Sequence, residues 1–240
     1  MERVDKALID PDVEPDAEKL HRVVRGAVGS LPLVGSAATE AFLSMFESPM
    51  NRRRTEWMLQ VTTAVNQMVD GGVVTLDGLL ENDRFVDVVL QASLIAQKTS
   101  KKIKLEALCN SIVNVASSRL SVVDKSSLFL RLIDSFDEWH IRVLHFYANP
   151  EAVFDVKEVA DKKLNLIDMV QIAIPELKGE VSYVSSIWYD LKHAGLIHGE
   201  SPTGFHLKHH VVDGQTIGVL AGMATAFGGE FLYFISNNEI

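Results

Sequence analysis

Apolar residues recur at the spacing of one helix face between residues 57 and 136, and this pattern constrains the fold more than any other feature of the chain. Trp57, Val61, Ala64, Val65 and Met68 stand at i, i+4, i+7, i+8 and i+11, which is the stripe expected on one side of a long helix. Later segments repeat the pattern with Phe85, Val89, Ala92, Ser93 and Ala96, with Leu105, Leu108, Ile112 and Val115, and with Leu128, Phe129, Leu132, Ile133 and Phe136. Because each amphipathic helix has to bury its apolar face against another element, the sequence predicts an α-helical bundle.

Capping residues predict where these helices begin and end. Ser48 followed by Pro49 favours a helix start, so a separate helix is expected over residues 36–47, and a short one over 16–28. Gly71 and Gly72 end the long helix that follows Pro49. A short helical turn is expected over 75–81, and the later N-caps are predicted to be Asn82, Ser100 and Asp124.

The chain changes character after about residue 136. A helix is expected to stop at Asn149–Pro150, a short one to cover 155–163, and a third, capped by Ser182, to close at Gly195. Residues 196–198 and 205–207 are predicted to form a small hairpin around a turn at 203–204, and Thr225 to cap a last helix. This order is that of a winged helix. The predicted fold is therefore mainly α, with a loose arm over residues 1–15, a helical bundle over 16–135, and a winged-helix domain (α with a small β-hairpin) over 136–240.

Short motifs along the chain are similar to those of a widespread family of bacterial hypothetical proteins. They are PLVG at 32–35, RRTEW at 53–57, NDRF at 82–85, KLEAL at 104–108 with Asn110, FLRLID at 129–134, DLKHAGLI at 190–197 and TAFGGEFLYFI at 225–235. The resemblance covers residues 31–236. It implies a bacterial origin and a helical body with a winged-helix-like ending, and it assigns no activity and no functional residue.

Composition narrows the function classes. Hydrophobic residues make up 47% of the 240, which excludes global disorder, and the net charge of -9 works against a dedicated nucleic-acid binder. The lone Cys109 excludes an intramolecular disulfide and is expected to be a small buried residue. The polar, acidic segment 1–16 does not have the pattern of a signal peptide, so we expect a cytoplasmic protein.

The sequence does not contain the usual catalytic motifs. We find no nucleophile elbow, phosphate-binding loop, dinucleotide-binding glycine pattern or His-Glu-x-x-His, so neither an enzyme nor a cofactor is expected. Asp134, Asp137, Glu138 and His140 form an acidic cluster in which Asp137 and His140 stand at i, i+3. A helical di-metal site would need a second such motif, which we do not find, so Ser135 or Asp137 acting as an N-cap is the alternative.

The chain contains a run of three arginines at an unusual position, Arg52, Arg53 and Arg54. They are predicted to lie in the first turn of the long helix, where the helix dipole favours acidic residues. One interpretation is a site that binds an anion, a lipid headgroup or an acidic partner. The other is a solvated face on which Arg52 pairs with Glu56 at i, i+4.

Histidines gather near the predicted hairpin. His206, His209 and His210 are weak zinc candidates, because neighbouring residues on a strand diverge and no cysteine completes the set, so we expect no metal. In the winged helix, Tyr183, Lys192 and Lys208 are the predicted contact residues. The helix over 182–194 has one lysine and no arginine, which favours contact with protein over contact with DNA.

These features predict a non-enzymatic interaction or regulatory protein of the bacterial cytoplasm that acts on a protein partner. A winged-helix DNA-binding regulator is an alternative. A second alternative is a membrane-active effector of defence or cell suicide that uses residues 26–46, where Glu40 is the one charged residue but serines, Thr39 and Pro32 make the segment polar for a span.

Overall fold

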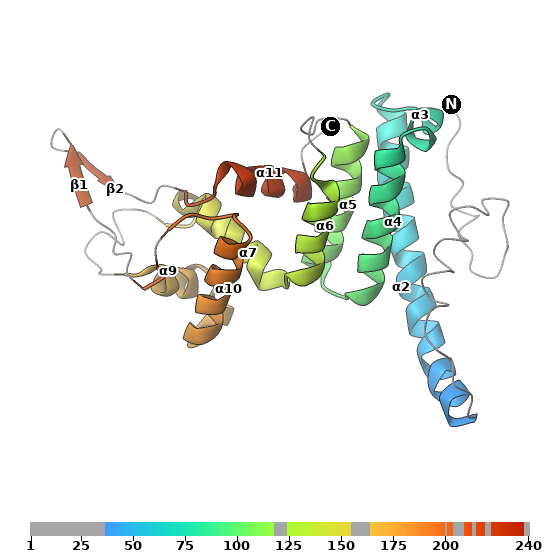
Figure 1. The fold of residues 1–240 in the computed structure, drawn as a ribbon, viewed down its shortest axis with the longest axis horizontal. Coiled ribbons are helices and arrows are strands. Elements are labelled where there is room, and N and C mark those ends of the chain that lie inside the picture. Colours follow the sequence, from blue (N-terminus) through green and yellow to red (C-terminus); the bar gives the residue numbers. More distant parts are fainter. Residues whose placement is uncertain are drawn as a thin grey trace. The chain divides into compact units, whose positions relative to one another are not determined.

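The computed structural model describes residues 37–117, 124–154, 164–199, 201–203, 209–212, 215–218 and 222–237, with side chains described from residue 50 onward except within 209–218. The chain divides into two compact units (Figure 1). Unit 1 comprises Met1–Asp134 and Phe234–Ile240, and unit 2 comprises Ser135–Tyr233. The predicted domain boundary lies between residues 135 and 136, but the last residues, predicted to be part of the second domain, belong to the first unit.

Unit 1 is built from helices. They are α2 (Ala37–Asp70), α3 (Leu76–Leu80), α4 (Asp83–Lys98), α5 (Lys102–Ala116) and α6 (Ser126–Ser135, whose last residue belongs to unit 2). Most residues of the apolar stripes form its core, and the most buried members include Met68, Ala92, Leu108, Ile112 and Ile133. The prediction is wrong for Leu128, which is 38% exposed, and Phe136 of the same stripe belongs to unit 2. Within this core the indole Nε1 of Trp57 donates to Ser93 Oγ at 2.9 Å, which joins α2 to α4.

The chain's last residues complete unit 1. The Phe129 and Phe234 rings lie 5.2 Å apart. The buried Asn114 amide donates to the carbonyl oxygens of Phe234 and Ser236, each at 3.0 Å, and so satisfies groups that the end of the last helix leaves without an intrahelical partner.

Unit 2 contains α7 (Glu138–Ala148), the 3₁₀ turn η2 (Pro150–Ala152), α9 (Leu166–Ala173), the 3₁₀ turn η3 (Pro175–Leu177) and α10 (Val181–His193). Strands β1 (His209–Val212) and β2 (Gln215–Gly218) pair antiparallel, with His209 opposite Gly218. Helix α11 (Ala226–Ile235) follows and belongs to unit 2 up to Tyr233. An isolated antiparallel bridge joins Ile197 to Ala224.

Two glycines allow unit 2 to close around this bridge. Gly195 has φ +74° directly after α10, the left-handed conformation that the sequence predicts for the end of this helix. Gly228 lies so close to the neighbouring chain that a Cβ there would stand 2.0 Å from the Leu196 carbonyl oxygen. The Thr225 hydroxyl accepts from Gly228 N–H at 2.9 Å, which confirms Thr225 as the cap of α11.

The mainly α-helical class is confirmed, and several predicted boundaries are wrong. Helix α2 continues through Ser48 and Pro49, so no new helix begins there. Proline removes one internal hydrogen bond, but a helix anchored along its later turns by buried residues can continue past it. The N-caps of α5 and α10 are Lys101 and Glu180, without side-chain hydrogen bonds, in place of Ser100 and Ser182.

Other expectations meet the structure only in part. Asn82 caps α4 as predicted, and Asp124 accepts from Ser126 N–H at 2.9 Å at the start of α6. Helix α9 is not foreseen by the sequence analysis. The predicted elements over 1–15, 16–28, 155–163 and 205–207 lie outside the described residues. Ile197 of the predicted strand 196–198 forms one bridge, and its partner is Ala224 instead of a residue of 205–207. The hairpin of the described residues joins 209–212 to 215–218, so the predicted hairpin and with it the winged helix are not supported.

Candidate interaction surface on the C-terminal unit

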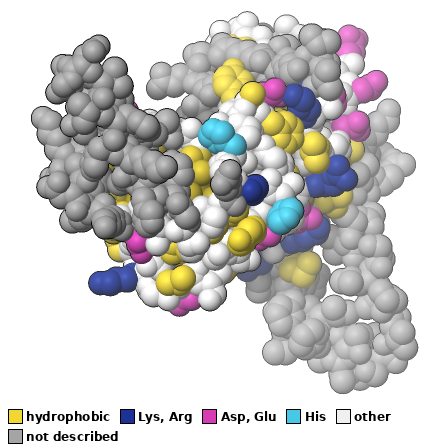
Figure 2. All heavy atoms as spheres, turned by 60° about the vertical axis from the view of Figure 1, so that its left-hand side comes forward, with side chains coloured by type: hydrophobic (Ala, Val, Ile, Leu, Met, Phe, Trp, Pro, Cys, Tyr) yellow, Lys and Arg dark blue, Asp and Glu magenta, His cyan; other side chains and the backbone are white. Residues whose placement is uncertain are grey.

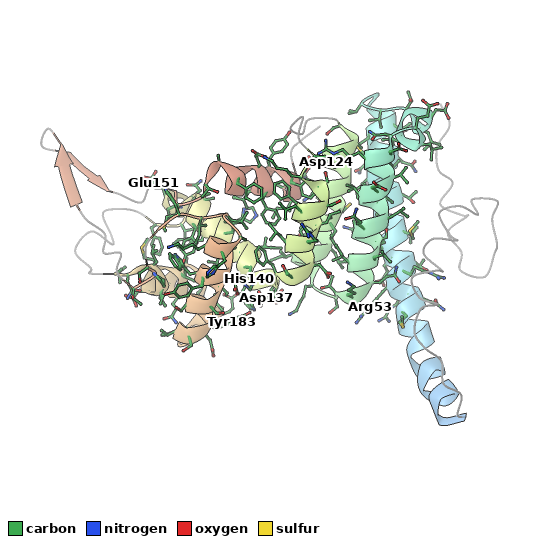
Figure 3. The ribbon with its side chains drawn as sticks, viewed as in Figure 1. Arg53, Asp124, Asp137, His140, Glu151 and Tyr183 are labelled. Carbon is green, nitrogen blue, oxygen red and sulfur yellow. The ribbon has the colours of Figure 1, made fainter. Side chains whose placement is uncertain are left out.

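A carboxylate, a phenol and an imidazole meet where α7 begins (Figure 3). Asp137 is the N-cap, and its Oδ1 accepts from the backbone N–H groups of Trp139 at 2.9 Å and His140 at 3.2 Å. Its Oδ2 accepts a hydrogen bond from the Tyr183 hydroxyl of α10. Of the two caps that the sequence analysis considers, Asp137 is therefore the correct one, and the cap also ties α7 to α10.

His140 extends this link. Its ring is buried, stacks on Phe136 with the ring centroids 4.8 Å apart, and lies between two carboxylates. Nδ1 is 2.8 Å from Asp137 Oδ1, and Nε2 is 3.2 Å from Asp190 Oδ2 on α10. A neutral imidazole carries one N–H and can donate to one carboxylate, whereas an imidazolium can donate to both. The i, i+3 pair of Asp137 and His140 thus belongs to a helix cap that is bound across to α10.

The pKa shifts of Asp137 and Tyr183 indicate a structural role for this cluster. Burial on its own would raise the pKa of Asp137, but the hydrogen bonds from Tyr183 and His140 outweigh it and hold that pKa below its ordinary value. Burial and the facing Asp137 carboxylate raise the pKa of Tyr183. Both shifts move the pKa values further from pH 7, so the carboxyl of Asp137 is ionised and the phenol of Tyr183 is protonated at that pH. Such a pair does not suit general acid–base catalysis, which needs a pKa near the working pH.

The cluster and the core together fix α10. Val184, Ile187, Trp188 and Leu191 recur at i, i+3, i+4 and i+7, and each is 0% exposed. The opposite side of the helix is exposed and carries Ser182, Ser186, Tyr189 and His193, with Val181 at its start. We call these five residues the α10 outer face. It is a helix surface held on a rigid inner face, which favours a preformed contact site.

Aromatic and small polar side chains dominate the α10 outer face. Tyr189 is 45% exposed and Val181 52% exposed, and neither lysine nor arginine belongs to this face. In the space-filling view, the lysine and arginine side chains of the visible surface are scattered among hydrophobic, acidic and histidine side chains (Figure 2). Phosphate contacts, which dominate binding to duplexes, would therefore have few partners here.

Two of the predicted winged-helix contact residues make contacts with other residues of unit 2. Tyr183 is half-buried and bound to Asp137, and the Lys192 ammonium lies over the Trp188 ring at 4.9 Å from its centroid. Lys208 lies outside the described residues. Tyr189 was not among the predicted contact residues, although its i+7 spacing from Ser182 on a helix already placed it on the exposed side.

The arginine run lies in the interior of α2, because this helix already begins at Ala37. The predicted conflict with the helix dipole is therefore wrong, since the dipole acts on the first and last turns. Arg52 and Arg53 are exposed and Arg54 is half-buried. The expected pair of Arg52 Nε with Glu56 Oε1 is present at 3.8 Å, with both side chains open to solvent.

The remaining candidates offer no assembled centre in the described part of the chain. Among the described residues, no group of three or more His, Cys, Asp or Glu side chains is arranged to hold a metal ion. His206 lies outside those residues, and His209 and His210 are described only through the backbone of β1.

Unit 1 has a hollow of about 410 Å³ with a lining that bears no charge. The lining residues are Leu59, Gln60, Thr63, Ala64, Gln67, Cys109, Asn110, Val113, Ser236 and Asn237. Burial raises the pKa of the Cys109 thiol to about 11, so the thiolate that a nucleophile needs is scarce at neutral pH. The hollow thus has walls of neutral polar and apolar groups and an inert thiol.

Among the helices in the described ranges, none combines the length and the apolar character needed to cross a membrane. Of the membrane candidate 26–46, residues 26–36 lie outside those ranges, and residues 37–46 are the first part of α2. Comparison with family models, with curated proteins and with solved structures finds no match to this chain.

Proposed function

We propose that the chain is a non-enzymatic interaction protein whose C-terminal unit is a winged-helix module that binds a protein partner through the α10 outer face. The single observation that carries this proposal is the exposed Tyr189 on a helix whose opposite face is fully buried. Tyrosine supplies a large, stiff contact area, and small serines beside it allow close approach and adaptable hydrogen bonding.

The order of helices and strands in unit 2 supports the proposal of a winged-helix module. Helices α7, α9 and α10 come first, the bridge from Ile197 to Ala224 follows α10, and the β1–β2 hairpin lies between the two bridged residues. In such a module α10 would be the recognition helix. Protein contact is favoured over DNA contact because Lys192 lies on Trp188 and Asp190 adds negative charge to the same helix.

A site-specific photocrosslinker at position 189 of the full chain tests the proposal in cells. We expect a discrete crosslinked protein, or a second copy of the chain, whose yield falls when Val181 and Ser186 are both replaced by Glu. A photocrosslinker in place of Leu80, a 67% exposed residue on α3, is the matched control and should not give the same product. Equal products from positions 189 and 80 would contradict the α10 outer face as a contact site.

The winged-helix order also favours one second candidate, a DNA-binding regulator. It predicts duplex binding that weakens with salt and with the change of Lys192 and Lys208 to Glu. An electrophoretic mobility assay at low salt separates the two functions, because the protein-binding proposal predicts unchanged mobility of the duplex. A turnover assay on a broad substrate panel tests the non-enzymatic part, which clear activity would overturn.

A further inference from the structure

Basic side chains from separate segments lie at one end of unit 1. Arg52, Arg53 and Arg54 come from α2, Lys98 ends α4, and Lys101 and Lys102 stand at the start of α5. The Trp57–Ser93 hydrogen bond sets the register of α2 against α4, and the two helices run in opposite directions (Figure 1). From that bond, Arg53 is about 6 Å along α2 and Lys98 about 7.5 Å along α4, at about 1.5 Å per residue. Both steps lead toward the same end of the bundle.

The helical spacing directs two of the three arginines toward the α4–α5 turn. Arg53 and Arg54 stand four and three residues before Trp57 and so share its side of α2, the side that faces the core. Helix α4 ends at Lys98, about as far from that hydrogen bond as Arg53 is, so Arg53 stands level with the end of α4 (Figure 3). Arg52 stands five residues before Trp57, about 140° around the helix from it, and is paired with Glu56.

The acidic side chains at this end that pair with lysines are Asp134 and Glu106. Lys98 Nζ is 3.0 Å from Asp134 Oδ2, and Lys102 Nζ is 3.5 Å from Glu106 Oε1. Arg53 and Arg54, by contrast, have no hydrogen bond or ion pair with any residue that the structure describes.

The start of α5 adds basic residues at this end of the bundle. The first turn of α5 contains no acidic residue, although acidic residues are favoured there. Lys101 and Lys102 occupy that start, three and four residues after Lys98 ends α4, so they belong to the same end of the bundle.

We propose that Arg53 and Arg54 bind a phosphate group at this end of the bundle, where Lys101 and Lys102 stand at the start of α5. The planar guanidinium carries N–H donors in a fork that matches two phosphate oxygens, and two long arginine side chains from neighbouring positions can both reach one phosphate. Arg52 does not belong to this site. The phosphate belongs to a lipid headgroup or to a soluble compound, since the same contacts serve both. This site is independent of the α10 outer face.

The double variant Arg53→Gln/Arg54→Gln tests the site in the full chain, with Arg52→Gln as the matched control. One arm measures the shift in melting temperature produced by inorganic phosphate and by pyrophosphate. The other measures cosedimentation with vesicles of phosphatidylcholine, with and without phosphatidic acid. We expect binding to weaken about tenfold or more in the double variant and to stay within about twofold in Arg52→Gln, because two charge-assisted contacts are lost in the first and none in the second.

Each outcome decides the proposal or the source of the phosphate. Binding of soluble phosphate supports the site with a soluble ligand, and binding confined to anionic vesicles supports it with a lipid headgroup. Absence of binding in both arms, or equal losses in Arg52→Gln and the double variant, would overturn it. If the double variant does not fold, the single change of the exposed Arg53 to Gln takes its place, with an expected loss of about threefold or more against less than about twofold in Arg52→Gln, because one charge-assisted contact is lost instead of two.

Discussion

Replacing Asp137 by Ala removes the cap of α7 and its link to α10 in one step. The lost cap costs about 1 kcal/mol. The hydrogen bond from Tyr183 and the contact with His140 cost about 0.5–1.5 kcal/mol each. The Asp137 side chain is 42% exposed, so solvent screens part of this, and we expect the free energy of unfolding to fall by about 2–3 kcal/mol in all.

Asparagine at the same position distinguishes the contribution of the N-cap hydrogen bonds from that of the negative charge. Asp and Asn are equivalent N-caps, so Asp137→Asn keeps the oxygen that accepts from Trp139 and His140 and should lose about 1 kcal/mol. Urea unfolding of the full chain measures both variants, and hydrogen exchange of peptides from α7 and α10 localises the effect. Asp87→Ala, which removes an exposed carboxylate on α4, is the control and should change stability by less than about 0.5 kcal/mol.

The pH dependence follows from the lowered pKa of Asp137. A carboxyl whose pKa is lower in the folded state stabilises that state above its unfolded pKa, near 3.9, and the contribution is lost as the pH falls through the folded value. The difference between the native chain and Asp137→Ala should therefore be complete at pH 7 and shrink below about pH 3.9. Equal stability of the Ala and Asn variants at pH 7, or a loss from Ala under about 0.5 kcal/mol, would refute this account of the cluster.

Three further changes test close packing, an unsatisfied hydroxyl and a buried thiol. Gly228→Ala should destabilise the chain by about 1–3 kcal/mol or more in thermal melting, despite the better helix propensity of Ala, because the backbone at Leu196 cannot move aside easily; an unchanged melting temperature would contradict the close approach. Tyr147→Phe should leave urea stability equal or raise it by up to about 1–2 kcal/mol, since the buried hydroxyl has no partner among the described residues, and a loss above about 1 kcal/mol would show that it has one. Cys109 should react with iodoacetamide at pH 8 about a hundredfold more slowly in the folded chain than in urea, because burial raises its pKa to about 11; equal rates, followed by mass spectrometry, would exclude this.

Local chemistry in the sequence was sufficient for most of the described helices and for several of their ends, but not for α9. Asn82, Asp137 and Thr225 each place a side-chain oxygen within three residues of the N–H groups that it caps, and the structure has all three bonds. The apolar stripes likewise predicted the buried side of α4, α5 and α10, because the period of 3.6 residues alone decides which side chains share a face.

Where local signals competed with packing, the sequence misled. Ser48–Pro49 has the chemistry of a helix start, yet α2 passes through it. Ser100 and Ser182 are favourable caps by type, yet α5 and α10 begin beyond Lys101 and Glu180. A cap is worth about 1 kcal/mol and an interior proline costs about 3, amounts that the burial of a few apolar side chains in the bundle can exceed.

The sequence by itself thus determined the helical class, the apolar faces and the caps whose donor and acceptor lie within one turn. The tertiary structure alone decided which distant groups meet. His140 reaches Asp190, fifty residues further along the chain. Tyr183, which the sequence offered as a contact residue, is bound to Asp137, and this leaves Tyr189 as the exposed aromatic residue of α10. Periodicity fixes the direction of a side chain about its own helix axis, but the register and separation of two helices come from packing, and these set every distance in the candidate sites.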